Sequence, residues 1–166
     1  MKIGLLLLIT ALVLSGCTAE PTFETIGNVW ENSHAEELPA SIEFGIPDDI
    51  VMEVMESDDN CRSYQIGDWM LWTEICNGGD IAATMKKLTG MKDAEMICHP
   101  SGMYSCHEAV WAVTEEEGEY VMRTAVIPKG AYHYCLSMKA PVEDARQMGE
   151  VFSQILKNVY LNDTDS

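Results

Sequence analysis

Two cysteine–histidine pairs are the residues of this chain best suited to chemistry. Cys98-His99 and Cys106-His107 flank a turn that contains Gly102, and Cys and His together can hold zinc. If the hairpin is centred on Gly102, Cys98 faces Cys106. Because successive side chains of a strand alternate between faces, the two histidines then lie on the other face. Four ligands divided between two faces cannot surround one ion, so we expect no metal site.

The same register makes Cys98 and Cys106 disulfide candidates. Cys106 could instead reach Cys135, if their strands are neighbours. If Cys98 and Cys106 pair, Cys135 remains as an odd thiol, which we expect to be buried and inert.

A second candidate disulfide joins the ends of a predicted hairpin from Cys61 to Cys76. With Asp68-Trp69 as its loop, Cys61 lies directly across from Cys76, at a separation that a disulfide accepts after a small adjustment. The core face of this hairpin then carries Tyr64, Ile66, Leu71, Thr73 and Ile75. Two buried thiols are the alternative.

Other side chains are open to two interpretations. The histidines His99, His107 and His133, with several methionines, could form a copper site, but most methionines fall on predicted core stripes. Four strand aromatics could line a ligand groove, although aromatic residues in strands more often belong to the core. These aromatics are Trp69, Trp72, Tyr132 and Tyr134.

Known catalytic signatures are absent from the sequence. It contains no G-x-S-x-G, no H-E-x-x-H, no P-loop and no dinucleotide fingerprint. We therefore expect a non-enzymatic protein without a cofactor.

The N-terminus has the anatomy of a cleavable signal. Lys2 precedes an apolar run, Ile3 to Leu14, that is too short to cross a bilayer. Leu14-Ser15-Gly16-Cys17 resembles the lipobox of bacterial lipoproteins. The resemblance implies a diacylglyceryl group on the Cys17 sulfur and cleavage just before it. An ordinary signal that ends in Cys is the alternative.

Charge restricts the partners of the remaining chain. Loss of residues 1–16, which carry only Lys2 as a charge, takes the formal net charge from −17 to −18. So acidic a body has no clustered basic residues for nucleic acid, and an anionic lipid surface would repel it. We expect attachment to the membrane through the lipid alone, on the extracytoplasmic face.

The order of elements predicts an α+β fold. A strand at 41–46 is followed by a short helix that Asp48-Asp49 caps, with Val54 and Met55 at helical spacing on its inner side. After the 61–76 hairpin, Asp80 caps a helix that runs from Ile81 and ends at Gly90, and an antiparallel meander follows over 94–138. A long helix follows, with Pro141 in its first turn and an apolar stripe from Ala145 to Val159. We expect an antiparallel sheet of about five to six strands covered by helices. The domain spans 39–161, after an acidic spacer at 17–38 and before a tail at 162–166.

This pattern resembles the PsbP-like fold, in which a long C-terminal helix covers an antiparallel sheet. The chain is also similar to small lipoproteins of Gram-positive, Clostridia-type bacteria, a resemblance that implies no known activity. The residues that carry the second likeness are Thr22 to Gly27, Cys106 to Trp111, and Tyr132 to Cys135.

Two functions from different classes fit these observations. The first is a membrane-anchored, non-enzymatic domain that binds an envelope protein or a small ligand. The second is a metal- or thiol-handling lipoprotein that uses Cys98, His99, Cys106, His107 and Cys135.

Overall fold

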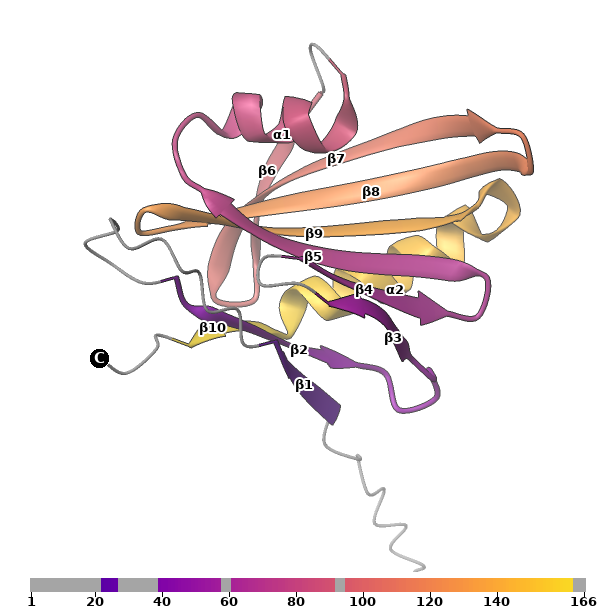
Figure 1. Ribbon diagram of the computed structural model, residues 1–166, viewed down its shortest axis with the longest axis horizontal. Helices are drawn as coiled ribbons and strands as arrows, with labels where there is room; N and C mark the ends of the chain where they lie inside the picture. The colour runs from indigo at the N-terminus through magenta and orange to yellow at the C-terminus, as the bar shows by residue number, and fades with distance from the viewer. Residues whose placement is uncertain (1–21, 27–38, 58–60, 92–94, 163–166) are drawn as a thin grey trace, which may run out of the picture.

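A computed structural model describes residues 22–26, 39–57, 61–91 and 95–162. Most of the described residues lie in β-strands, and the described part of the chain also contains two α-helices (Figure 1). The strands are β1 (Thr22–Ile26), β2 (Ser41–Ile46), β3 (Glu53–Ser57), β4 (Cys61–Ile66), β5 (Trp69–Asn77), β6 (Ile97–Ser101), β7 (Tyr104–Glu115), β8 (Gly118–Lys129), β9 (Tyr132–Pro141) and β10 (Val159–Asn162). The helices are α1 (Ile81–Thr89), the short 3-10 helix η1 (Val142–Asp144) and α2 (Ala145–Lys157).

The strands form two antiparallel sheets. Seven strands make the main sheet in the order β3-β4-β5-β9-β8-β7-β6, and β1-β2-β10 make a smaller one. The predicted antiparallel sheet with helices is therefore confirmed in outline, but five to six strands was too low. The structure is richer in sheet than predicted, because three further segments also pair as strands: Thr22–Ile26, Glu53–Ser57 and Val159–Asn162.

The principal core lies between the main sheet, α2 and the smaller sheet. Helix α2 buries the stripe predicted for it, including Met148, Phe152 and Ile155. It is shorter than expected, because Pro141 ends β9 instead of starting the helix, and Val159 belongs to β10. The largest fully buried side chains of the described residues are Tyr64, Tyr134, Phe44, Phe152, Ile42, Leu71, Ile75, Met85, Ile127, Leu136 and Met138.

Helix α1 lies on the opposite face of the main sheet from α2 (Figure 1). The Asp80 side chain caps its first turn by accepting a hydrogen bond from the Ala82 amide at 3.1 Å. Gly90 ends it in the left-handed conformation, as predicted. Met85 of α1 packs with three residues of the sheet, Ala109, Val126 and Cys135.

The helix predicted after Asp48-Asp49 is wrong. Residues 53–57 form β3 at the edge of the main sheet, antiparallel to β4. Their apolar residues were expected on a buried helical stripe, but Val54 is 51% and Met55 59% exposed. The spacing of the apolar residues fits one side of a helix, and it gives no indication that this segment pairs with β4.

The hairpin formed by β4 and β5 exists, but its predicted register was wrong by two residues. Gly67 and Asp68 form the turn, and Ile66 pairs with Trp69, so Cys61 pairs with Glu74 and not with Cys76. A Cys61–Cys76 disulfide is absent, and both residues carry thiols. A shift of two preserves the faces of a strand, so the predicted core residues are buried as expected: Tyr64, Ile66, Leu71, Thr73 and Ile75.

The predicted register of the hairpin formed by β6 and β7 was wrong by one residue. Ser101 pairs with Tyr104 across a Gly102-Met103 turn, so Cys98 pairs with His107, and His99 with Cys106. The predicted Cys98–Cys106 disulfide is absent, since the two thiols lie on opposite faces of the sheet. The alternative Cys106–Cys135 pair is also wrong, because β8 separates their strands.

Two boundaries of the predicted domain also change. Residues 22–26, assigned to the spacer, form β1 and pair with β2, and Asn162 ends β10 instead of starting a tail. The predicted signal, Cys17 and most of the spacer lie outside the described residues.

Candidate functional site

The face of the main sheet that α1 contacts collects most of the chemically interesting residues. Strand registers place five of them, together with Val126, in one row of six cross-strand partners that runs from β6 to β4. Three of the six are cysteines. Directly paired residues point to the same face of a sheet, so all six side chains lie on the face that α1 contacts. In order across the sheet, the row is Cys98, His107, Val126, Cys135, Glu74 and Cys61.

Helix α1 covers only part of this face. Thr84 hydrogen-bonds to His133 Nδ1 at 2.8 Å, and Lys87 Nζ lies 2.5 Å from Glu74 Oε1. Both contacts hold the helix over the end of the sheet where β5 and β9 carry Cys76 and Cys135. The other end of the same face has no helix over it in the described chain.

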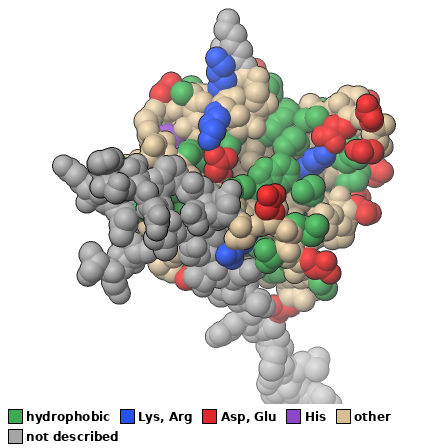
Figure 2. Space-filling view, viewed as in Figure 1, with side chains coloured by type: hydrophobic (Ala, Val, Ile, Leu, Met, Phe, Trp, Pro, Cys, Tyr) green, Lys and Arg blue, Asp and Glu red, His purple; other side chains and the backbone are tan. Residues whose placement is uncertain are grey.

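We call the uncovered part the open face and define it by Met70, Trp72, Trp111 and Met122. Met70, Met122 and Trp111 belong to one cross-strand row through Lys139, and Trp72 lies in the next row. Met70 is 36% exposed, and the other three are half-buried. Figure 2 shows hydrophobic side chains gathered on the right-hand side of the molecule, with acidic side chains at their edge.

A pocket of about 270 Å³ lies at the β4–β5 end of the open face. It has an aromatic and thioether wall from Trp72 and Met70, and polar groups from Glu56, Cys61 and Ser63. Mostly apolar walls with a few polar groups are typical of sites for small ligands, and this volume lies just below their usual range.

Away from the pocket, two sets of polar side chains on the open face are engaged with one another. Lys139 forms an ion pair with Glu115, and its Nζ lies 4.1 Å from the centroid of the Tyr120 ring. Thr124 and Ser137 share a hydrogen bond of 2.7 Å. The face therefore offers apolar contact more than a ready donor or acceptor.

Two thiols lie under α1, beside the open face. Cys76 Sγ and Cys135 Sγ are 3.9 Å apart on the neighbouring strands β5 and β9. Cys76 is half-buried, and Cys135 is 1% exposed. The hydrogen bond from Cys135 lowers the pKa of Cys76, against the opposing effects of burial and Glu74. The same contact, followed by burial, raises the pKa of Cys135 well above its ordinary value.

The residues first considered as zinc ligands are split between the two faces. On the α1 face, Cys98 Sγ lies 3.8 Å from His107 Nε2. On the α2 face, Cys106 Sγ lies 3.5 Å from His99 Nε2. Across the described ranges, no three His, Cys, Asp or Glu side chains converge as metal ligands would. The expected division, with both cysteines on one face and both histidines on the other, is wrong, because each face holds one cysteine and one histidine.

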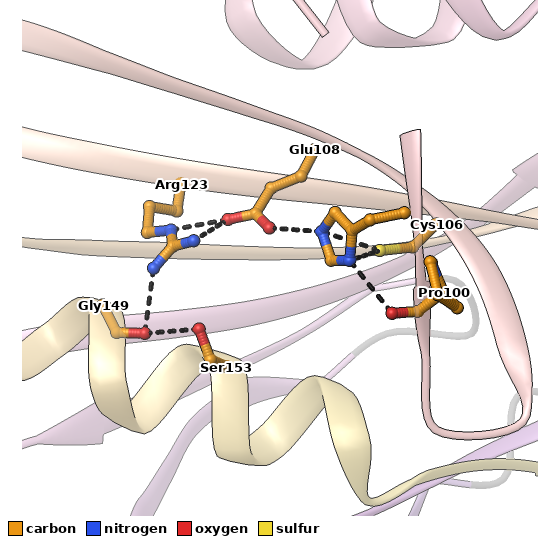
Figure 3. Close-up of polar contacts among 7 residues, drawn as sticks. Pro100, Cys106, Glu108, Arg123, Gly149 and Ser153 are labelled. Carbon is orange, nitrogen blue, oxygen red and sulfur yellow. Dashed lines mark hydrogen bonds and ion pairs between the residues drawn. The ribbon is translucent and has the colours of Figure 1, made fainter. Parts of the chain in front are cut away.

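Cys106 and His99 belong to a polar network that joins the sheet to α2 (Figure 3). His99 Nε2 lies 2.9 Å from Glu108 Oε2, and Arg123 Nε donates to Glu108 Oε1 at 2.6 Å. Arg123 Nη1 then donates to the Gly149 carbonyl of α2 at 2.9 Å. Glu108 is 7% exposed, so this network satisfies a buried carboxylate.

The Cys106–His99 contact is a poor nucleophilic pair. Cys106 Sγ lies 3.5 Å from Nε2 and 3.8 Å from Nδ1 of His99, but Glu108 already engages Nε2 and the Pro100 carbonyl engages Nδ1. A base oriented for catalysis keeps one nitrogen for the nucleophile and one for the group that orients it. Burial raises the pKa of Cys106 to about 11, so its thiol stays protonated near neutral pH. We interpret the network as structural.

The residues considered for an aromatic groove and for a histidine cluster do not come together in one place. Trp69, Tyr132 and Tyr134 are core residues, as favoured, and only Trp72 reaches the open face. His107 and His133 share the α1 face, but His99 lies on the other, so the three do not gather. Of the methionines assigned to core stripes, Met85, Met138 and Met148 are buried, whereas Met55 is 59% exposed.

The functional residues that the sequence did not reveal are those that depend on long-range pairing. Trp111 and Met122 join Trp72 only because β7, β8, β9 and β5 are consecutive in the sheet. Thr84 and Lys87 reach the thiol pair only because α1 packs across this end of the face. Alternation along a strand predicts which face of the sheet a side chain lies on, but not which residues of the neighbouring strands lie beside it.

Among the described residues, neither helix has the length and apolar character needed to cross a bilayer. No family model and no curated protein matches the chain. Several solved structures resemble it. One from Bacteroides thetaiotaomicron has a TM-score of 0.55 at 11% identity, over 74% of this chain and 45% of the other. This chain thus spans less than half of that protein.

A variant of the protein Mog1 has a TM-score of 0.50 at 13% identity, over 74% of this chain and 92% of its own. LpqN of Mycobacterium tuberculosis, described as involved in cell envelope biogenesis, has a TM-score of 0.46 at 11% identity, over 85% and 91%. The Bacteroides and Mog1 structures share the fold of this chain, and identities this low carry nothing about activity.

Proposed function

We propose that this chain is a lipid-anchored, extracytoplasmic, non-enzymatic domain that binds a small apolar ligand on its open face. The observation that carries the binding role is the half-covered sheet. Helix α1 covers the thiol end of one face, and the neighbouring half keeps Trp72 and Met70 at a pocket. Exposed aromatic and thioether groups beside a concavity favour ligand contact over a purely structural surface.

The anchor of this proposal rests on residues 1–17. A short apolar run followed by Leu14-Ser15-Gly16-Cys17 supports lipid attachment at Cys17, which places the acidic domain outside the cytoplasm. Two acyl chains hold a protein durably without basic residues near the surface. The membrane is then a partner through the lipid alone, and nucleic acid is not a partner.

A binding role without catalysis fits the paired polar groups elsewhere on the open face. Lys139 is held by Glu115, and Thr124 by Ser137. General acid or base catalysis needs a titratable group within hydrogen-bond reach of the substrate. Groups already paired with each other give the site shape and apolar contact instead.

The neutral apolar dye N-phenyl-1-naphthylamine tests this site without charge repulsion from the acidic protein. The mature chain from Cys17, produced without its signal, should bind the dye saturably with a rise in fluorescence. Trp72→Ala should weaken binding by about tenfold or more, as expected for loss of a central aromatic contact. Val142→Ala removes an exposed apolar side chain outside the open face, and it should bind like the parent.

Thermal melting of both variants establishes that they are folded before the titration. Equal dye binding by the parent and by a folded Trp72→Ala variant would remove the open face as the site. Absence of saturable binding by the parent would count against an apolar ligand altogether.

A further inference from the structure

We propose that Cys76 and Cys135 are a redox-active dithiol that closes to a reversible disulfide by exchange with a small-molecule or protein disulfide. Cys76 is the thiol that attacks, and Cys135 is the thiol that resolves. This role is separate from ligand binding at Trp72 and uses residues on the other half of the same sheet face.

The geometry brings the two sulfurs close without joining them. Cys76 pairs with His133 and Cys135 with Glu74, so the cysteines lie on a diagonal between β5 and β9. Their Sγ atoms are 3.9 Å apart, and a disulfide bond of about 2.05 Å requires them to approach by roughly 2 Å. Cys76 is one residue from the end of β5 at Asn77, so the approach requires a shift of only the last residues of that strand.

Access differs sharply between the two thiols. Cys76 lines a pocket of about 390 Å³ with Asp80, Thr84 and Lys87 around it. Cys135 is 1% exposed and packs against Met85 and Val126. An external disulfide can therefore reach Cys76 and cannot reach Cys135.

The surrounding groups prepare Cys76 for attack. The Cys135 thiol, the Lys87 ammonium and Thr84 all favour the Cys76 thiolate, and their combined effect exceeds the opposing effects of burial and Glu74. Thiolates, not thiols, attack disulfides, and a lowered pKa increases their fraction. Lys87 is positioned by its ion pair with Glu74 at 2.5 Å.

The exchange proceeds in two steps. In the first, the Cys76 thiolate attacks one sulfur of R–S–S–R, giving a Cys76–S–S–R mixed disulfide and R–S⁻, which takes up a proton. In the second, Cys135 releases its proton to solvent and attacks Cys76 Sγ, and the second R–S⁻ leaves and is protonated. Overall, two protein thiols lose two electrons and two protons, and R–S–S–R becomes two R–SH.

The first step also activates the second. The contact with Cys76 is the largest cause that raises the pKa of Cys135, and the charge of the Cys76 thiolate adds to it. Formation of the mixed disulfide removes that charge and that hydrogen bond. The pKa of Cys135 then falls at the moment when its thiolate is needed.

Peptide-resolved mass spectrometry on the full chain in membranes tests this sequence of steps. The reduced protein is treated with oxidised glutathione, and remaining thiols are then alkylated. The parent should yield a linked Cys76–Cys135 peptide. Cys135→Ser should accumulate the glutathione adduct of Cys76, whereas Cys76→Ser should leave Cys135 unmodified in the folded protein.

Cys98→Ser is the matched control, because Cys98 is exposed and lies at the far end of the cross-strand row. It should form the Cys76–Cys135 link as the parent does, and addition of reduced dithiothreitol should reverse the link in both. Melting curves identify any variant that fails to fold. Persistence of free Cys76 and Cys135 in oxidised parent protein, or a link that forms only after denaturation, would overturn the proposal. Dye binding at Trp72 is measured separately, so either role can fail alone.

Discussion

Lys87 Nζ of α1 lies 2.5 Å from Glu74 Oε1 of β5, on the same side of the sheet as Cys76. The Glu74 carboxylate of this pair raises the pKa of Cys76, and the Lys87 ammonium partly offsets that effect by favouring the thiolate. The link between helix and strand is exposed on the lysine side, so its contribution to stability is small. Its effect on the thiol is separable from its effect on the fold.

Replacement of Lys87 by Met should therefore slow the alkylation of Cys76 several-fold at neutral pH, because the pKa of the thiol rises. Rates of iodoacetamide labelling, measured for the Cys76 peptide across a pH series, check this. Lys86→Met is the control, since Lys86 is the neighbouring exposed lysine of α1. Identical pH profiles for the two variants would mean that Lys87 does not tune the thiol.

Arg123 should stabilise the fold through Glu108. Arg123→Met leaves a buried carboxylate without its main cation, so we expect a loss of about 3 kcal/mol in the free energy of unfolding, measured in urea. Arg146→Met breaks an exposed pair with Glu150 and should change it by less than about 0.5 kcal/mol.

A double variant sharpens this test. Arg123→Met with Glu108→Met removes both buried charges, and it should recover much of the stability lost in the single variant. A double variant at least as unstable as the sum of the two single variants would argue against an uncompensated carboxylate as the cause.

The same network predicts a pH dependence at His99. The hydrogen bond to Glu108, and then the contact with the Pro100 carbonyl, raise the pKa of His99 above its ordinary value of 6.5. A raised pKa for a base contributes stability that is complete below 6.5 and is lost as the pH rises through the folded value. The stability difference between the parent and His99→Gln should therefore shrink from pH 6 to pH 8.

The pKa of His133 shifts in the opposite direction, because burial lowers it. The stability that depends on neutral His133 is therefore lost on acidification. The comparison of parent and variant cancels that contribution. Urea unfolding at both pH values measures the difference. A gap that widens toward pH 8 would contradict the proposed ion pair with Glu108.

Gly102 should be more sensitive to substitution than Gly67. Both have a left-handed φ, +56° and +57°, at the first position of a hairpin turn. A Cβ at Gly102 would lie 2.5 Å from the Lys157 carbonyl oxygen at the end of α2, and a Cβ at Gly67 meets nothing within 4 Å. Gly67→Ala should cost about 1 kcal/mol from conformation alone, and Gly102→Ala clearly more, by thermal or urea unfolding. Equal losses would show that the close approach to α2 is unimportant.

Local patterns in the sequence identified most elements and their buried faces. Helix α1 was predicted with its caps, and the buried stripe of α2 was predicted from Met148 to Leu156. These features depend on neighbours a few residues away. The segment at 53–57 was mistaken for a helix, because its strand character comes from pairing with β4.

Register was the main source of error at the candidate sites. In both mispredicted hairpins the glycine is the first turn residue with a positive φ, which is the arrangement of a type II′ turn. Centring the predicted turn on Gly102 shifted the register by one residue. Cys98 was therefore paired with Cys106 instead of with His107. The contact between Cys76 and Cys135 depends on β5 pairing with β9, which no local pattern in the sequence encodes.

Incorporation of labelled palmitate tests the lipid anchor most directly. Cells that produce the parent should yield labelled protein in the membrane fraction, and Cys17→Ser should take up no label and leave the membrane pellet. A parent protein without label, or a Cys17→Ser variant held in the pellet as firmly as the parent, would contradict the proposed anchor.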